Sequence, residues 1–106
     1  MARKKNQLTL IKNKLKKYVQ VLTRTVKVDK MILFGSYAKG KAHEFSDIDI
    51  ALVMQNNGDM IQTQIDLMKL RRMIDLRIEP HPFYVNDFNI SNPVANEIIK
   101  HGIELS

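Results

Sequence analysis

The 106-residue sequence contains no cysteine and no tryptophan, and it has only four glycines and three prolines. The absence of cysteine excludes a disulfide framework and any metal site built from thiolates, and an oxidising compartment is not needed. No apolar run approaches the roughly 20 residues of a transmembrane helix. We therefore expect one soluble, cytoplasmic domain over residues 1–106, without contact with a membrane.

Acidic residues are outnumbered, since 17 lysines and arginines stand against 11 aspartates and glutamates and give a net charge of +6. The ordinary explanation is a solvated helix face, and the alternative is attraction to nucleic acid or to an acidic partner. Aromatic residues do not alternate with the lysines, which disfavours a base-stacking surface. Much of the excess lies in the first 30 residues, at Arg3, Lys4, Lys5, Lys12, Lys14, Lys16, Lys17, Arg24, Lys27 and Lys30.

Apolar periodicity and turn residues predict seven elements in the order helix, strand, short helix, strand, helix, strand, helix. This order indicates a small α/β domain, with a three- to four-stranded mixed sheet and helices packed mainly on one side. The predicted helices cover Gln7 to about Thr25, Ser36–Lys39, Met60–Arg72 and Pro93 to about His101, and the predicted strands cover Met31–Phe34, Asp47–Met54 and Met73–Glu79.

Capping residues support several of these boundaries. Asp59 is expected to cap the helix that follows it, and Asn92 to cap a helix that opens with Pro93 and ends at Gly102. The prolines of segment 80–82 should end the last strand or confine it to a sheet edge. The third helix carries a stripe at helical spacing, formed by Ile61, Ile65, Met68 and Arg72 and widened by Leu67 and Leu70.

Two carboxylates interrupt an otherwise apolar strand. Asp47 and Asp49 project from one face of it, roughly 7 Å apart along the chain. A third acid, Asp75, lies on another predicted strand, and neighbouring strands would bring all three together. Such acids repel and raise one another's pKa unless a divalent cation lies between them. Oxygen ligands suit Mg²⁺ or Mn²⁺, and a pair of these ions supports phosphoryl transfer.

Gly35 and Ser36 follow the first predicted strand and open the predicted short helix. Their backbone N–H groups could face a phosphate, because glycine lets the backbone approach closely and helix N-termini bind anions. The Ser36 hydroxyl could donate to a phosphate oxygen. Lys39 and Lys41 lie close enough in sequence to help neutralise a triphosphate.

Each feature also has a simpler explanation. A Gly-Ser pair is often only a turn, and Asp-x-Asp is often a surface strand or a Ca²⁺ loop. Asp75 could be an ion-pair partner of Arg77 or Arg72. The three histidines share no ligand spacing, and segment 80–83 is expected to shape the strand exit.

Gly35-Ser36, ten residues and then Asp47-Ile48-Asp49 resemble the signature of the nucleotidyltransferase superfamily, G-S-x-(about ten)-D-x-D. The chain is similar to its minimal members, the MNT family. Residues 72–77 resemble the strand of DNA polymerase beta that carries the third catalytic aspartate. The resemblance covers about residues 31–82, and Glu79, on the same strand face as Asp75, competes as the third ligand.

The resemblance implies roles for individual residues. Asp47 and Asp49 would bind two Mg²⁺ ions, with Mn²⁺ as an alternative, and Asp75 would complete the site nearest the attacking hydroxyl. Gly35 and Ser36, helped by Lys39, would hold the triphosphate. The implied reaction is attack by a hydroxyl on the α-phosphate of a nucleoside triphosphate, most simply ATP, with release of pyrophosphate.

Larger superfamily members hold the acceptor with an extra helical domain, and this chain has no residues for such a domain. The acceptor is therefore expected to lie outside the chain. It would be a partner protein, a second copy of the chain, or a nucleic acid. MNT proteins commonly pair with a helical HEPN ribonuclease toxin and add AMP to its tyrosine, which predicts an antitoxin. The alternatives are transfer to RNA or a small molecule such as an aminoglycoside, and a non-catalytic binding module that blocks its partner.

Overall fold

The structure is a computed structural model that describes residues 2–43 and 45–105, with side chains from residue 7 onward. Arg3, Lys4 and Lys5, counted above in the basic N-terminal stretch, have side chains outside this described part. In chain order the elements are α1 (Ala2–Leu22), β1 (Val28–Phe34), β2 (Ile48–Met54), α2 (Met60–Leu70), the 3₁₀ turn η1 (Arg71–Met73), β3 (Ile78–Tyr84), the 3₁₀ turn η2 (Val85–Asp87), α3 (Pro93–His101) and β4 (Ile103–Glu104).

The four strands form one mixed sheet in the order β3-β2-β1-β4. β1 runs antiparallel to β2 and to β4, whereas β2 and β3 run parallel. Phe34 pairs with Asp49, and Asp49 pairs with Glu79. The end of β1 and the starts of β2 and β3 therefore meet at one end of the sheet. The predicted mixed sheet is confirmed, and β4 is a strand that the sequence pattern did not reveal.

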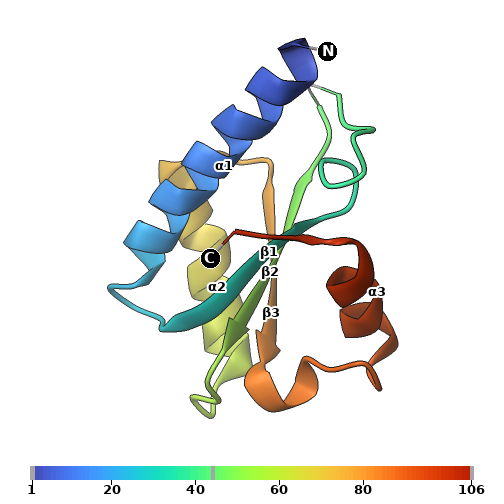
Figure 1. Ribbon diagram of the computed structural model, residues 1–106. Coiled ribbons are helices and arrows are strands. Elements are labelled where there is room, and N and C mark those ends of the chain that lie inside the picture. Colours follow the sequence, from blue (N-terminus) through green and yellow to red (C-terminus); the bar gives the residue numbers. More distant parts are fainter. Residues whose placement is uncertain (1, 44, 106) are drawn as a thin grey trace.

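The two long helices cover one face of the sheet, and α3 lies on the other (Figure 1). The helices are thus packed mainly on one side, as predicted. The Tyr18 hydroxyl of α1 donates to the Leu67 carbonyl of α2 at 2.6 Å, and burial raises the pKa of Tyr18, so this donor stays protonated. Alternate residues of β2 fill the hydrophobic core between the sheet and the two long helices: Ile48, Ile50, Leu52 and Met54.

Strand β3 forms one edge of the sheet and contains Pro80 and Pro82. Proline has no N–H to give to a neighbouring strand, so the edge position fits both residues. Side chains of the preceding helical segment cover carbonyls of this strand: Arg71 Nη1 donates to Ile78 O at 2.9 Å, and Gln64 Nε2 donates to Pro80 O at 3.2 Å. The predicted confinement of these prolines to an edge is confirmed.

The helix caps are also as predicted. The Asp59 carboxylate accepts the Gln62 N–H at 2.9 Å, and the Asn92 side chain accepts N–H groups of the first turn of α3. Pro93 opens α3, and Gly102 follows its last residue. These local signals fixed the start of α2 and both ends of α3, because a side-chain acceptor or a missing donor acts within one turn.

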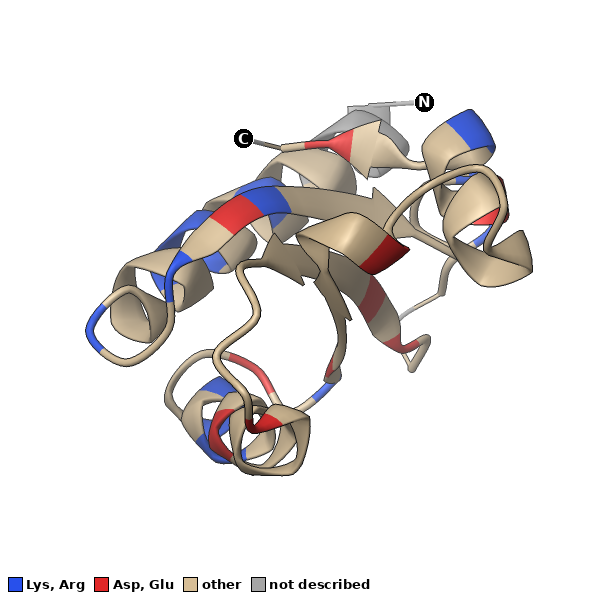
Figure 2. Ribbon diagram, turned by 90° about the horizontal axis from the view of Figure 1, so that it is seen from below, with Lys and Arg blue, Asp and Glu red and all other residues tan. Residues whose placement is uncertain are grey.

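The stripe predicted on the third helix is only partly buried. Ile61 is 78% exposed and Ile65 is 42% exposed, whereas α2 buries Thr63 and Leu67 against the sheet. Lysine and arginine residues follow α1 and the loop after it, while α2 carries both signs of charge (Figure 2). Within residues 2–43 and 45–105, no helix is both long and apolar enough to cross a bilayer.

The strand predicted over Met73–Glu79 is wrong in position, since β3 begins only at Ile78. The cause is local. The Asp75 carboxylate accepts the backbone N–H of Arg77 at 2.9 Å, and the Asp75 carbonyl accepts the N–H of Ile78 at 3.2 Å. An aspartate that bonds its own backbone two residues on forms a turn that competes with strand pairing.

Candidate active site

The segment after β1 forms hydrogen-bonded turns where a short helix was predicted. Lys39 N–H donates to Gly35 O at 3.1 Å, and Lys41 N–H donates to Ser36 O at 3.0 Å. Gly35 has a φ of +71°, and a Cβ atom on it would lie 2.5 Å from Oδ2 of Asp49. Only glycine therefore lets this turn lie directly against the Asp49 carboxylate. The two halves of the motif, which ten residues separate in the sequence, are therefore in contact through Gly35 and Asp49.

Asp49 and Glu79 face each other in the register of β2 and β3. With His81, they offer ligand atoms that all lie within 4.8 Å of one another. His81 Nε2 lies 3.2 Å from Oδ1 of Asp49, and the Phe34 ring packs edge-on against the imidazole at a centroid distance of 5.0 Å. The parallel pairing of two strands thus builds a cluster of two carboxylates and one imidazole.

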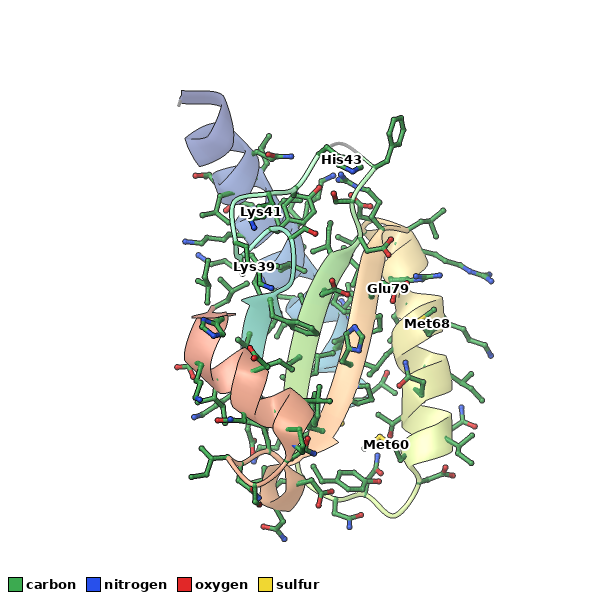
Figure 3. All side chains as sticks on the ribbon, turned by 90° about the vertical axis from the view of Figure 1, so that its right-hand side faces the viewer. Lys39, Lys41, His43, Met60, Met68 and Glu79 are labelled. Carbon is green, nitrogen blue, oxygen red and sulfur yellow. The ribbon has the colours of Figure 1, made fainter. Side chains whose placement is uncertain are left out.

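Asp47 lies one residue before β2 and is exposed. Strand alternation places it on the face of Asp49, toward the end of the sheet where the Gly35 turn lies. Figure 3 labels Lys39 and Lys41 on the segment that joins β1 to β2, at the same end of the sheet as Glu79. The backbone therefore brings Gly35, Ser36, Lys39, Asp47 and Asp49 to one end of the sheet, but among the described residues Asp47 is not part of the cluster of Asp49, Glu79 and His81.

Asp75 is not among these residues. Its Oδ2 accepts Lys14 Nζ at 2.8 Å and Arg77 Nη2 at 2.7 Å, and its Oδ1 accepts Arg77 Nε at 3.0 Å. The hydrogen bonds from Arg77, with a further one from Lys14, hold the pKa of this carboxyl well below its usual range. Asp75 lies before β3 and not on it, so the structure does not bring the three aspartates together as predicted. The competing residue, Glu79, does lie beside Asp49.

The chemistry of this donor set fits a divalent cation. Within the described part of the chain, no lysine or arginine forms an ion pair with Asp49 or Glu79. Two adjacent carboxylates without a lysine or arginine partner repel each other, and a cation relieves that repulsion. Carboxylate oxygens suit Mg²⁺ and Mn²⁺, and the imidazole of His81 adds a ligand that Mn²⁺ accepts more readily than Mg²⁺.

The family profile described as "Polymerase beta, Nucleotidyltransferase" matches residues 13–106 of the sequence. The chain belongs to this family. It is similar to two candidate protein adenylyltransferases of Methanocaldococcus jannaschii. It shares 31% identity with MJ1379 over 98 residues, which covers 91% of this chain and 94% of that protein. It shares 38% identity with MJ1215 over 55 residues, which covers 52% of this chain and 64% of that protein.

Solved structures support the same assignment for this nucleotidyltransferase. A chain of a toxin–antitoxin crystal structure with AMP-PNP superposes with a TM-score of 0.66 at 25% identity, over 90% of this chain and 72% of that one. A candidate nucleotidyltransferase from Sulfolobus solfataricus superposes with a TM-score of 0.57 at 20% identity, over 95% and 80% of the two chains, and supports the fold alone. The predicted nucleotidyltransferase fold and enzyme class are confirmed.

A cavity of about 430 Å³ opens beside the Gly35 turn of this nucleotidyltransferase. Its volume is in the range of about 300–1,000 Å³ typical of small-molecule pockets. Apolar side chains line much of it, and charged groups stand among them. The lining residues are Phe34, Gly35, Lys39, Pro93, Val94, Glu97, Ile98 and His101.

His81 is the site residue that sequence reasoning missed. A signal was present, because Glu79 and His81 stand two residues apart and therefore share one face of a strand. The prolines on either side of His81 obscured it, since they suggested a strand end. Only the pairing of β2 with β3 shows that this face is the face of Asp49.

Proposed function

We propose that this nucleotidyltransferase moves AMP from ATP to a tyrosine hydroxyl of a helical HEPN toxin, and that it is the antitoxin of that pair. The contact between Gly35 and Asp49 carries the proposal, because it joins a phosphate-binding turn to a metal-binding carboxylate. The relatives named for protein adenylylation support AMP as the transferred group. The similarity to a toxin–antitoxin chain supports the type of partner.

The donor nucleotide would lie across the Gly35 turn. The backbone N–H groups of this turn and the Ser36 hydroxyl would bind the phosphates, and Lys39 would neutralise part of their charge. Lys39 also lines the cavity next to α3, so phosphates on the turn leave the nucleoside within reach of that cavity. We assign the cavity to the nucleoside of ATP.

Asp47, Asp49 and Glu79 would hold the divalent cations, with His81 beside them. Mg²⁺ or Mn²⁺ would neutralise charge on the phosphates and lower the pKa of the attacking hydroxyl. The cluster of Asp49, Glu79 and His81 fits such ions by ligand type and spacing. We leave Asp75 out of the proposed ligands, because it is bound to two basic side chains.

In the reaction, the acceptor oxygen forms a bond to the α-phosphorus, and the bond from that phosphorus to the bridging oxygen breaks. AMP stays on the acceptor, and pyrophosphate leaves. The hydroxyl proton would pass to Glu79 or His81, which lie beside Asp49 in the carboxylate cluster. The use of ATP as the proposed donor supports the cytoplasm as the proposed location of this reaction.

A first experiment tests the donor site without any acceptor. ATP is titrated into the wild-type protein and Asp49→Asn, with Mg²⁺ and with EDTA, and we expect binding that needs both the metal and the aspartate. Addition of a candidate HEPN protein and labelled ATP should then label that protein on tyrosine. Labelling of RNA or of an aminoglycoside instead would refute the proposed acceptor. Metal-independent binding, or none, would refute the nucleotide site.

A second experiment compares the two acids that competed as the third ligand. Binding of Mn²⁺ with ATP is followed by the loss of the free-ion electron paramagnetic resonance signal, in Glu79→Gln and in Asp75→Asn. We expect Glu79→Gln to weaken Mn²⁺ binding by roughly 10-fold or more. Once ATP is bound to Asp75→Asn, that variant should bind the same number of Mn²⁺ ions as the wild type. The reverse pattern would return Asp75 to the ligand set.

A further inference from the structure

A chain of polar contacts runs from α1 to the turn that carries Gly35 and Ser36. It starts at Lys14, passes through Asp75 and Arg77, and ends at Tyr37. None of the four residues lies in the carboxylate cluster described above. The contacts connect segments that are far apart in the sequence, since Arg77 and Tyr37 are separated by 40 positions.

The centre of this chain is a tightly paired aspartate. Asp75 accepts two side-chain hydrogen bonds from Arg77, at 3.0 Å to Oδ1 and 2.7 Å to Oδ2, in a bidentate arrangement. The Asp75 side chain is only 11% exposed. A bidentate guanidinium–carboxylate pair fixes the plane and direction of the arginine, which a single point charge would not do.

The fixed arginine in turn holds Tyr37. Arg77 Nη1 donates to the Tyr37 hydroxyl oxygen at 3.0 Å, and the Tyr37 hydroxyl is 3.4 Å from the carbonyl of His43. Tyr37 is 6% exposed, and it follows Gly35 and Ser36 directly. His43, labelled in Figure 3, lies in the loop that continues toward β2. The tyrosine thus ties the phosphate-binding turn to the segment that leads to Asp47.

We infer that Asp75 is a positioning residue of the nucleotide site, which acts through Arg77 and Tyr37 to hold the Gly35–Ser36 turn against Asp49. The role for ATP binding rests on the proposed function, whereas the effect on the turn does not. A turn that contains a residue at φ +71° competes with other backbone conformations. If only part of the population has the binding-competent turn, the apparent affinity falls by that fraction.

Three single variants test the inference. Asp75→Asn removes the charge but keeps the shape, and Tyr37→Phe deletes only the hydroxyl that Arg77 contacts. Lys14→Met is the matched control, because it removes the other ion pair of Asp75 without touching Tyr37. The first readout is the amide ¹H–¹⁵N signals of Gly35 and Ser36 without nucleotide. The second is the Kd for ATP with Mg²⁺.

We expect Asp75→Asn and Tyr37→Phe to shift both amide signals and to weaken ATP binding by about fivefold each, the factor that corresponds to one net hydrogen bond. Because the two residues act through Arg77, the double variant should bind ATP no more weakly than the weaker single variant. Lys14→Met should leave both readouts as in the wild type.

Wild-type amide signals for Gly35 and Ser36 in Asp75→Asn and Tyr37→Phe would overturn the inference. So would additive losses in the double variant, or equal shifts in Lys14→Met, which would indicate general loosening of the packing of α1. If Asp75→Asn does not fold, Tyr37→Phe still decides, since it removes one oxygen atom. If the wild-type protein does not bind ATP, the proposed function fails, but the amide signals still test the turn.

Discussion

Gly35 and Asp49 lie in contact, although thirteen residues separate them in the sequence. A Cβ atom on Gly35 would lie 2.5 Å from Oδ2 of Asp49 and 3.3 Å from its Cγ. This closeness makes the turn and the carboxylate a single unit, in which a bound phosphate and a bound cation would be neighbours. The contact is possible because Gly35 has no side chain.

Gly35→Ala should abolish ATP binding, and Gly58→Ala should not. Both glycines have positive φ values, +71° and +79°, so both substitutions should lower the free energy of unfolding by about 1–2 kcal/mol. Only Gly35 has Asp49 next to it, whereas a Cβ on Gly58 meets nothing within 4 Å. A Cβ on Gly35 would push the turn and the Asp49 carboxylate apart, and both are proposed to hold the nucleotide and its cation. Titration with ATP and urea unfolding measure the two effects, and equal ATP binding in both variants would contradict the prediction.

Tyr18→Phe should destabilise the fold, because it removes the 2.6 Å hydrogen bond that joins α1 to the Leu67 carbonyl of α2. Tyr18 is fully buried, so the carbonyl loses its partner out of reach of water. We expect a loss of about 1–3 kcal/mol in the free energy of unfolding. Tyr84→Phe is the control, since its hydroxyl makes an exposed 3.3 Å contact with Asn57, and a change within about 0.5 kcal/mol is expected. Equal losses in the free energy of unfolding for Tyr18→Phe and Tyr84→Phe, measured by urea unfolding, would contradict a stabilising role for the buried hydrogen bond.

Asp75 should make stability depend on pH in the acid range. Its pKa in the folded protein lies well below the value of about 3.9 for an unfolded chain, chiefly because of the hydrogen bonds from Arg77. The stabilisation is therefore fully present above the unfolded pKa, and it is lost as the pH falls toward the folded pKa. Compared with Asp75→Asn, the wild type should be more stable by about 1.5–3 kcal/mol at pH 5–7. That difference should shrink below about pH 4. A difference that stays constant down to pH 2 would contradict this cause.

Val94→Trp should weaken ATP binding if the cavity next to α3 receives the nucleoside. Val94 lines the cavity and is 58% exposed, so a larger side chain can enter the cavity without disturbing the core. Filling a site with excess volume typically costs about 1–3 kcal/mol, which is roughly 5- to 150-fold in Kd. Ile99→Trp is the control on the same helix, because Ile99 is 44% exposed and is not part of the lining. Unchanged ATP binding in Val94→Trp would leave the cavity without this role.

Local chemistry made much of the fold predictable. Asp59 and Asn92 cap the helices that follow them, and Pro93 opens α3, because these effects act within one turn of backbone. The alternation of β2 was also clear, since one face had to hold the core. The Asp47–Asp49 pair could be proposed as a site from that alternation together with the Gly35-Ser36 pair upstream.

The third acid could not be chosen from the sequence, because the choice depends on where β3 begins. Asp75 and Glu79 occupy alternate positions that face the same way in an extended segment, and the family resemblance favoured Asp75. The turn formed by Asp75 with the Arg77 N–H delays the strand to Ile78, and the register then pairs Asp49 with Glu79. Which strand pairs with which, and in what register, is a property of the folded sheet and not of a local pattern.

The two prolines of β3 affect which partners the domain can bind. Along this edge of the sheet, Pro80 and Pro82 supply no N–H donors, and the carbonyls of Ile78 and Pro80 are already occupied by side chains. The opposite edge is β4, which has only two residues. Such edges discourage strand addition, the route by which sheets recruit extended peptides and also aggregate. If the acceptor is a tyrosine, as proposed, we expect it to come from a helix or a folded loop of its own protein, and not from an extended tail that adds to the sheet.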